Sequence, residues 1–180
     1  MTTTTTADPR YPVGRYAPSD APTEADRARW TGEIAALPDA LRAAVSGLDA
    51  ARLATPYRPG GWTVRQLVHH VADSHMNAYA RFKLALTEDE PTIKPYDEGR
   101  WALLPDVEAV DPGVSLLLLD ALHARWAALL AALPPDAWAR TFRHPDQGRT
   151  MRLDHTLGLY AWHGRHHTAH VTRLREREGW

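Results

Sequence analysis

Apolar residues recur at steps of three and four along four long stretches of the chain, and this spacing predicts four amphipathic α-helices. The first stretch begins after Thr23, which can cap a helix. Pro38 lies inside this stretch, so we expect a kink or a break near residues 36–37. Its apolar stripe consists of Trp30, Ile34, Leu37, Leu41, Val45 and Leu48.

The second stretch has the clearest helix start in the sequence. Thr63 and Gln66 have the spacing of a capping box, in which each side chain bonds to the backbone N–H of the other residue. Trp62 and Leu67 stand at the two positions of a hydrophobic staple. We expect this helix to run to about Leu86.

Two more helices are predicted over residues 112–133 and 152–177. The apolar stripe of the third helix is predicted as Val114, Leu118, Leu122, Trp126, Leu129 and Leu133. The segments between the helices, 87–110 and 134–151, are polar and contain proline, with almost no strand pattern. Connections of this length are often functional.

These patterns predict an all-α fold, a four-helix bundle with long second and third connections. We expect one domain over residues 11–180, after a short disordered leader at residues 1–10. The chain contains no internal repeat and no composition shift that would divide it further.

The composition narrows the classes of function. The 180 residues include no cysteine, which excludes disulfides, thiolate metal ligands and a cysteine nucleophile. The formal net charge is -1 with basic residues scattered along the chain, whereas nucleic-acid binding usually needs a concentrated basic face. Residues 1–10 lack the pattern of a signal peptide, and no apolar run reaches the roughly 18 residues that span a bilayer. We therefore expect a cytoplasmic protein without nucleic-acid or membrane partners.

The most unusual local pattern is "HGRHHTAH", residues 163–170, which holds four of the ten histidines. At about 100° per residue, His163, His167 and His170 fall within about 60° of one another, on the apolar face of the last predicted helix. His166 lies at the margin of that face. The pairs His163/His167 and His166/His170 both have the spacing that lets two imidazoles converge on one ion, so this helix alone leaves both pairs open.

A single histidine on an apolar face is usually a core residue satisfied by hydrogen bonds. Three stacked histidines favour a shared metal ion instead, because each buried imidazole needs partners and an ion satisfies several at once. Haem, another bundle cofactor, takes only one or two axial histidines.

A further ligand is expected from the second helix, which contains "VHHVADSH" at residues 68–75. His70 adjoins a polar stripe that borders the core and could line a pocket, formed by Ser74, Asn77 and Arg81. His69 is expected to face solvent with Asp73, and His75 to lie in the core. His70 is therefore our candidate. The other histidines are expected to be ordinary core or surface residues: His123, His144 and His155.

Four segments of the chain resemble the signature segments of the DinB superfamily, and specifically its YfiT-like branch. They are "YPVGRYAP", "YRPGGWTVRQLVHHVADSHMNAYARFKLALTEDEPTIKPYDE", "LHARW" and "LGLYAWHGRHHTAH", so the resemblance covers nearly the whole chain from Tyr11 onward. It implies a four-helix bundle that holds one divalent ion through three histidines. The matching positions are His70, His163 and His167. Position 170, often Gln in that family, is His here, which leaves a fourth contact open.

The resemblance also implies an activity and an assembly. The branch is described as metal-dependent hydrolases, and close relatives resemble transferases that join the thiol bacillithiol to electrophiles. It further implies a homodimer, to which the seven Trp and six Tyr of this small chain add weak support, since interfaces favour such residues. The historical link of the family to DNA damage implies nothing about DNA binding.

Three neutral histidines would leave a divalent ion with its full charge and with open positions, as a catalytic site requires. We expect Zn²⁺, with Ni²⁺ as the alternative. The favoured activity is transfer of a small-molecule thiol to an electrophile, because the chain has no thiol of its own and a thiol needs less help from a base than water does. The alternative is hydrolysis of an amide or ester. A different class, a structural or sensing site closed by His170, is also open.

The expected pocket is formed by the stripe of Ser74, Asn77 and Arg81 together with His166. The segment 87–110 is expected to shape the electrophile's part of the pocket, through Tyr96, Asp97 and Trp101. No general base is evident, because Asp73 is predicted on the wrong face and His166 is marginal.

Overall fold

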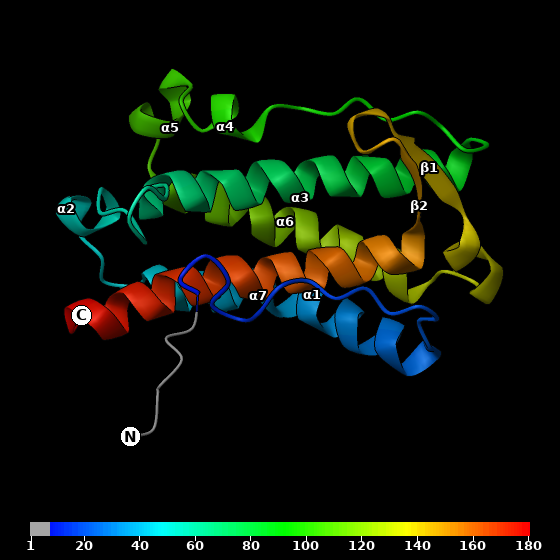
Figure 1. Ribbon diagram of the computed structural model, residues 1–180, viewed down its shortest axis with the longest axis horizontal. Coiled ribbons are helices and arrows are strands. Elements are labelled where there is room, and N and C mark those ends of the chain that lie inside the picture. Colours follow the sequence, from blue (N-terminus) through cyan, green and yellow to red (C-terminus); the bar gives the residue numbers. More distant parts are fainter. Residues whose placement is uncertain (1–7) are drawn as a thin grey trace.

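Four long helices form a bundle in the computed structural model, which describes residues 8–180 (Figure 1). They are α1 (Glu24–Val45), α3 (Val64–Thr87), α6 (Pro112–Ala131) and α7 (Leu153–Glu178). The predicted all-α four-helix bundle is therefore confirmed. Helix α1 packs mainly against α6 and α7, and α3 packs against the same two helices. The long connections thus make α3 and α7 neighbours, although they are far apart in the sequence.

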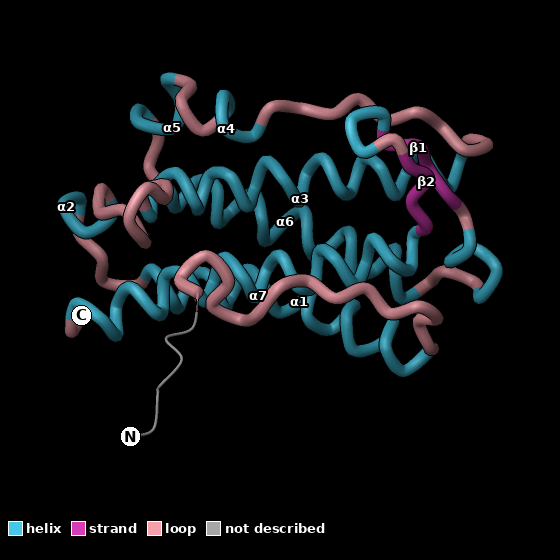
Figure 2. Tube along the Cα trace, viewed as in Figure 1, coloured by secondary structure: helices cyan, strands magenta, loops and turns pink. Residues whose placement is uncertain are grey.

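Short elements occupy the connections (Figure 2). They are α2 (Ala50–Leu53), α4 (Glu98–Trp101), α5 (Pro105–Ala109), η1 (Pro135–Ala139), β1 (Thr141–His144), η2 (Pro145–Gln147) and β2 (Arg149–Arg152). The two strands pair antiparallel, with Thr141 opposite Arg152, and Gly148 has the positive φ of 60° that closes the turn. This hairpin was not predicted, because "TFRH" and "RTMR" are short and lack an alternating apolar pattern.

The predicted leader falls partly outside the described residues, which begin at residue 8. Residues 8–10 form a turn in which Arg10 is paired with Asp8. The segment that follows runs along α7 and α1 (Figure 1). Its contacts to α7 are specific: the Tyr16 hydroxyl donates to the His155 carbonyl at 3.1 Å, and Trp162 Nε1 donates to the Gly14 carbonyl at 3.1 Å.

Both predicted helix caps form. Thr23 makes a capping box with Asp26 at the start of α1, and Thr63 makes one with Gln66 at the start of α3. These boxes fix the first residues of the two helices, so the position of every later residue on α3, including the histidines, is set from Thr63 onward.

Of the kink or break expected at Pro38, the break does not occur, since α1 continues through this residue. Proline has no N–H to donate to the carbonyl four residues earlier, which is that of Ile34. That carbonyl has another partner: His123 of α6 places Nδ1 2.5 Å from the Ile34 oxygen. The hydrogen bond that Pro38 removes is thus replaced by one from a neighbouring helix.

The prediction of the buried face of α6 was wrong, because a different side of the helix faces the core. Val114 and Leu118 are exposed by 54% and 43%, whereas the core side of the helix consists of Leu116, Leu119, His123, Trp126 and Leu130. The helix is apolar on almost every side, so periodicity could not show which face is buried. By length and composition alone, α6 is also apolar enough to span a membrane. In the bundle it packs against α1 and α3.

The core consists of two apolar clusters separated by a layer of histidines. One cluster is centred on Trp30, Phe82, Trp126 and Leu157, and the other on Leu41, Val68, Leu119 and Leu174. Between them, at the level where α3, α6 and α7 pass from one cluster to the other, lie His75, His123, His163 and His167. This histidine layer places polar rings in the middle of the core, in addition to buried polar residues elsewhere such as Asp154 and Thr156.

Candidate metal centre

Three histidines from two helices converge beside this layer. The Nε2 atom of His163 is 3.3 Å from Nε2 of His70 and 3.1 Å from Nε2 of His167. One ring nitrogen of each residue lies within 4.8 Å of the others. His70 and His167 are buried and His163 is partly buried. We call His70, His163 and His167 the triad.

The triad has the geometry of a site for a divalent ion. A tetrahedral zinc ion bound at about 2.0–2.1 Å keeps its ligand nitrogens about 3.3 Å apart, and the two Nε2 separations match this spacing. Histidine nitrogens suit zinc, nickel, copper and iron, whereas calcium and magnesium prefer oxygen ligands. The donor set thus fits a transition-metal ion and leaves it at least one open position.

Local packing brings the two ligand-bearing helices to the same place. His163 and His167 lie one turn apart on α7, so their rings project in the same direction. Gly164 lies between them, and a Cβ atom there would be 2.8 Å from Cδ2 of Leu37 on α1. The missing side chain therefore allows α7 to lie against α1 at the level of the triad.

Burial keeps the histidines of the triad in the neutral form, which is the form that a metal ion would require. Desolvation lowers the pKa of His70 to about 4, and the proximity of His166 adds to the effect. Desolvation likewise holds the pKa values of His163 and His167 well below 6.5, with further lowering by the neighbouring imidazoles. The imidazoles are therefore unprotonated at neutral pH and available as ligands.

The other i, i+4 pair of α7 does not join the triad. Nε2 of His166 and Nε2 of His170 are 3.1 Å apart, so these two histidines pair with each other. The ring of His170 also lies against Tyr57, with 4.2 Å between centroids. Of the two pairs that the sequence left open, His163/His167 is the one that faces His70.

His75 and His69 lie on either side of His70 in the sequence and have different surroundings. His75 is fully buried, as expected, and its Nε2 is 3.1 Å from Nδ1 of His163. His69 was expected to face solvent, but it is buried, with Nδ1 2.8 Å from the Ser115 hydroxyl. The expectation was wrong because the start of α6 and the short helix α5 cover that side of α3.

Two cavities meet at the triad. The first, of about 400 Å³, is lined by Tyr57, Arg58, Gly60, Gly61, Trp62, His70, Glu98, Trp162, His163, His166 and His167. The second, of about 300 Å³, is lined by Ser74, Arg81, Pro95, Tyr96, Glu98, Phe142, His144, Asp146, Met151, Thr156, Leu159, Tyr160 and His163. Within residues 8–180, only His163 and Glu98 line both cavities.

The predicted pocket residues divide between these cavities. Ser74 and Arg81 line the second cavity, where Arg81 Nη1 donates to the Tyr160 hydroxyl at 3.2 Å, and His166 lines the first. Asn77 is not among the described residues that line either cavity. Its amide instead donates to the backbone oxygen of Asp73 at 2.8 Å.

The segment 87–110 contributes less directly than expected. Tyr96 lines the second cavity, and Trp101 packs on its ring with 4.5 Å between centroids. Asp97 caps α4 by accepting a hydrogen bond from the Arg100 N–H, so its role is local. The residue next to it, Glu98, borders both cavities.

Glu98 is a functional candidate that sequence reasoning missed. Although much of the residue is exposed, desolvation raises the pKa of its carboxyl, and neighbouring Asp97 adds to the rise. Asp73 also has a raised pKa, about 6, mainly through desolvation, but it lines neither cavity. Of the two carboxyl groups, Glu98 is therefore the better functional candidate, because it lines the cavities. In the sequence it is one acid among several in a polar segment, and nothing there distinguishes it.

The loop before α3 supplies the other residues that were missed. Trp62 packs on the ring of His70 with 4.6 Å between centroids, so it does more than serve as a staple. Arg58 lines the first cavity, and its Nε is buried without a hydrogen-bond partner among the described residues. The run "YRPGGW", placed directly before a ligand-bearing helix, was the available signal.

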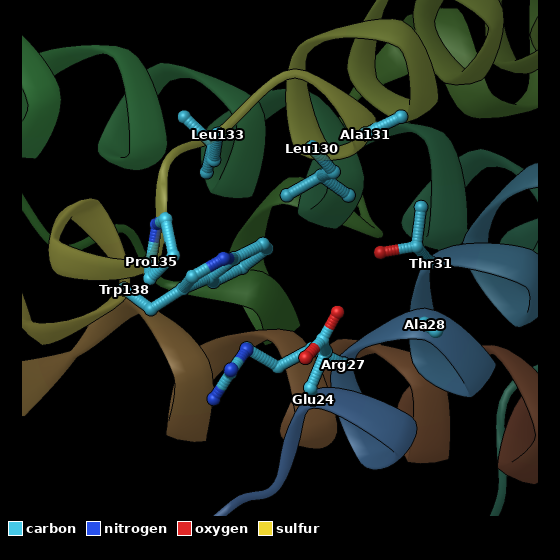
Figure 3. Close-up of a pocket in the computed structure, with 9 residues that line it drawn as sticks. All are labelled: Glu24, Arg27, Ala28, Thr31, Leu130, Ala131, Leu133, Pro135 and Trp138. Atoms are coloured by element: carbon cyan, nitrogen blue, oxygen red, sulfur yellow. The ribbon is translucent and has the colours of Figure 1, made fainter.

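A third cavity lies at the end of the bundle where α1 begins and α6 ends (Figure 3). Its volume is about 430 Å³, and Trp138 forms one wall. The guanidinium carbon of Arg27 lies 5.8 Å from the centroid of the Trp138 ring. None of the residues that line it is a histidine, and none lines the cavities beside the triad. The cavity of larger volume is therefore not the one beside the triad.

The chain is similar to proteins of known family. A model of the DinB superfamily matches residues 33–171. The chain is 56% identical over 173 residues to proteins of Bacillus mycoides and Bacillus cereus, and 55% identical to one of Bacillus anthracis. Each alignment covers 96% of this chain and 99% of the relative, and each relative is named "Putative metal-dependent hydrolase".

A solved structure shares the fold. YfiT from Bacillus subtilis superposes with a TM-score of 0.93 at 48% sequence identity, over 96% of this chain and 98% of YfiT. That protein is described as a probable metal-dependent hydrolase with an unusual four-helix bundle topology. Taken with the extent of the family match, this likeness shows that the chain belongs to the DinB superfamily.

Proposed function

We propose that this chain is a metal-dependent enzyme whose single divalent ion is held by the triad, with Zn²⁺ favoured and Ni²⁺ the alternative. The observation that carries the proposal is the convergence of three Nε2 atoms, two pairs of them 3.3 and 3.1 Å apart, at the junction of two cavities. The names of the relatives support it. When bound, the ion would supply Lewis acidity that lowers the pKa of a thiol or water reaching it.

The favoured reaction is transfer of a small-molecule thiol, of the bacillithiol type, to an electrophilic carbon. Two cavities that meet at His163 and Glu98 provide separate places for two substrates, which hydrolysis does not require. The chain has no cysteine, so the thiol comes from a small molecule. In the reaction the S–C bond forms as the bond from carbon to its leaving group breaks, and the thiol proton passes to solvent or to Glu98.

The protein's own residues would orient the two reactants. Arg58 presents a cationic side chain in the first cavity, next to the triad. In the second cavity Arg81 and the hydroxyl of Tyr160 form a hydrogen-bonded pair, and burial raises the pKa of Tyr160, so its hydroxyl stays protonated. Tyr96, whose pKa is also raised by burial, adds a second protonated hydroxyl.

The second candidate function is hydrolysis of an amide or ester, and Glu98 is the observation that favours it. A carboxylate at the junction of the cavities could accept a proton from the attacking water and return it to the leaving group as the C–N or C–O bond breaks. The names of the relatives also favour this reaction.

A purely structural or sensing site is less well supported. Such sites are usually closed by four protein ligands, and His170 was the candidate for the fourth. His170 pairs with His166 instead, and the triad borders two cavities.

Co-substrate dependence distinguishes the two reactions. Ion-loaded protein would be incubated with monochlorobimane with and without bacillithiol, and separately with model esters and amides without thiol. Transfer predicts conjugate formation above the uncatalysed rate only when thiol, ion and triad are all present, with His163→Ala as the inactive reference. Metal-dependent cleavage without thiol, lost in Glu98→Gln, together with no conjugate, would replace transfer by hydrolysis.

We also propose that the protein is a cytoplasmic homodimer that takes small-molecule substrates. Support for the dimer comes from an exposed apolar stripe on α6, where Val114, Leu117 and Leu118 are 54%, 66% and 43% exposed. Contiguous apolar surface of this kind commonly marks an interface. The balanced charge of the chain gives no support to a nucleic-acid partner.

A further inference from the structure

His75 is a buried histidine that the proposed chemistry does not use, and it touches His163 of the triad. Its Nε2 lies 3.1 Å from Nδ1 of His163, while Nε2 of His163 faces His70 and His167. Both nitrogens of His163 are thus engaged, one on the side of the triad and the other by His75. No part of the His75 side chain reaches solvent.

The protons on these rings follow from the role of the triad. An imidazole that binds an ion through Nε2 carries its proton on Nδ1, so His163 Nδ1–H must donate and His75 Nε2 must accept. A neutral His75 then carries its own proton on Nδ1. His123 has the same form, because its Nδ1 faces the Ile34 carbonyl, which can only accept.

In the described part of the chain, no charged group is in ring contact with His75. Its ring stacks on His123 with 5.0 Å between centroids and meets the edges or faces of Tyr160 and Trp126 at 5.2 and 5.8 Å. Metal-binding histidines usually donate their second N–H to a carboxylate, a backbone carbonyl or water. Here the acceptor is a neutral imidazole among uncharged aromatic rings, so it adds no negative charge beside the ion.

We propose that His75 is a positioning residue for the metal centre: it accepts the hydrogen bond of His163 Nδ1–H, fixes the ring so that Nε2 points at the ion, and leaves the ion's charge uncompensated. This inference rests on the proposed function, because it requires an ion at the triad. It assigns His75 a role in metal affinity and in the electrophilic strength of the site, and no direct contact with substrate.

The test compares metal affinities of matched variants by competition with a chromophoric chelator. His75→Leu removes the acceptor and is expected to weaken binding about 10–100-fold. His75→Gln places an amide oxygen near the former Nε2 position and should restore affinity to within a few-fold of the wild type. His69→Leu is the control, since His69 is also a buried histidine of the same helix but bonds to Ser115. It should leave metal affinity unchanged.

A spectroscopic measurement on the wild type makes the inference independent of any variant's folding. Nitrogen-15 spectra of the histidine side chains in ion-loaded protein should show His75 with a protonated Nδ1 and an unprotonated Nε2. Three results would overturn the inference while leaving the metal site intact. They are a His75 protonated on Nε2 instead of Nδ1, equal metal affinities of His75→Leu and the wild type, and equal losses of metal affinity in His75→Leu and His69→Leu. A wild-type protein that takes up no ion would overturn the proposed function as well.

Discussion

The ten histidines of this chain differ in what their ring nitrogens touch, and those contacts separate metal-ligand candidates from structural residues. His163 faces two other Nε2 atoms, whereas His166 and His170 face each other and His123 faces a backbone carbonyl. Spacing along the helix is the same for His163/His167 and His166/His170. Only the position of α3 distinguishes them, because it brings His70 to one pair.

This distinction predicts which substitutions remove the ion. Changing His70, His163 or His167 to Ala should reduce metal content from one ion per chain to well below stoichiometry, since two imidazoles hold an ion far less tightly than three. His166→Gln and His170→Gln should keep one ion per chain. Elemental analysis of untagged protein measures both groups. Full metal content in the Ala variants, or its loss in His170→Gln, would contradict the ligand assignment.

Burial of the same imidazoles predicts how stability depends on pH. Desolvation holds the pKa of His70 at about 4, against 6.5 for an exposed histidine. As pH falls below 6.5 the unfolded chain binds protons that the folded chain does not, so the free energy of unfolding of metal-free protein decreases. His70 alone should contribute a loss of about 2 kcal/mol between pH 7.5 and pH 5.

Urea unfolding of the metal-free protein at the two pH values measures this loss, and His70→Gln should show a smaller one. His163 and His167, whose pKa values are also well below 6.5, should add to the decrease in both proteins. A free energy of unfolding that stays constant from pH 7.5 to pH 5 would mean that the triad is more hydrated than its burial indicates.

At the residue scale the sequence predicted the triad but not its surroundings. His163 and His167 share an apolar face of one helix, and the resemblance to a family selected them together with His70. Glu98 and Arg58 were missed because they lie in irregular segments, whose side-chain directions follow from tertiary packing and show no periodicity. His69 was misplaced for a related reason: residues that are distant in the sequence cover it.

At the scale of elements, α1 depends on a contact from another helix. Pro38 leaves the Ile34 carbonyl without its helical donor, and His123 supplies the hydrogen bond. From the sequence we predicted a kink or a break at Pro38 and an ordinary core or surface role for His123. The two features compensate each other, and only the packing of α6 against α1 makes this visible.

A double-mutant cycle tests this compensation. His123→Leu should lower the free energy of unfolding by about 1–3 kcal/mol, because it leaves a buried carbonyl unsatisfied. In the Pro38→Ala background the helix regains its own N–H donor, so the same His123→Leu change should cost about 1 kcal/mol less. Urea unfolding of the four proteins gives the coupling energy. Strictly additive losses would show that the two residues act independently.

The close contact between α7 and α1 predicts that a larger residue at position 164 destabilises the protein. Gly164→Ala places a methyl group 2.8 Å from Leu37 Cδ2, and overpacking typically costs about 1–3 kcal/mol, more than the roughly 1 kcal/mol gained in helix propensity. The variant should therefore unfold more easily and bind metal more weakly, because α7 must shift where it carries the triad.

Gly32→Ala is the matched control. Gly32 lies inside α1, and a Cβ atom there would meet nothing within 4 Å. That change should stabilise the protein by up to about 1 kcal/mol. Thermal unfolding distinguishes the two variants. If both raise the melting temperature equally, α1 and α7 are not held at the distance that Gly164 permits.

At the scale of the whole molecule, assembly can be tested on α6. If its exposed apolar stripe forms the dimer interface, Leu117→Glu should give a monomer at micromolar concentration, because it places a charge in a surface that excludes water. Val13→Glu, at another exposed apolar residue, should leave the mass unchanged. Sedimentation equilibrium measures both. A monomeric wild type would reject the dimer, and a dimeric Leu117→Glu would place the interface elsewhere.

The architecture as a whole was predictable because four long helices and their caps are local features. The connections were less predictable. The hairpin β1–β2 and the order in which the helices pack depend on contacts between distant residues, as does the buried face of α6. The two cavities arise where those connections meet the bundle, so the pocket was known only through the residues on α3 and α7.

The placement of the triad on two helices also affects how long the protein would persist in a cell. His70 and His163 are 93 residues apart, and a chain without cysteine has no disulfide to join α3 to α7. An ion bound to both would bind the folded bundle in preference to the unfolded chain, adding about 4 kcal/mol of stability at a thousand times its dissociation constant. Scarcity of metal would then expose more unfolded chain to proteases. The amount of this protein, as well as its activity, would follow the metal supply.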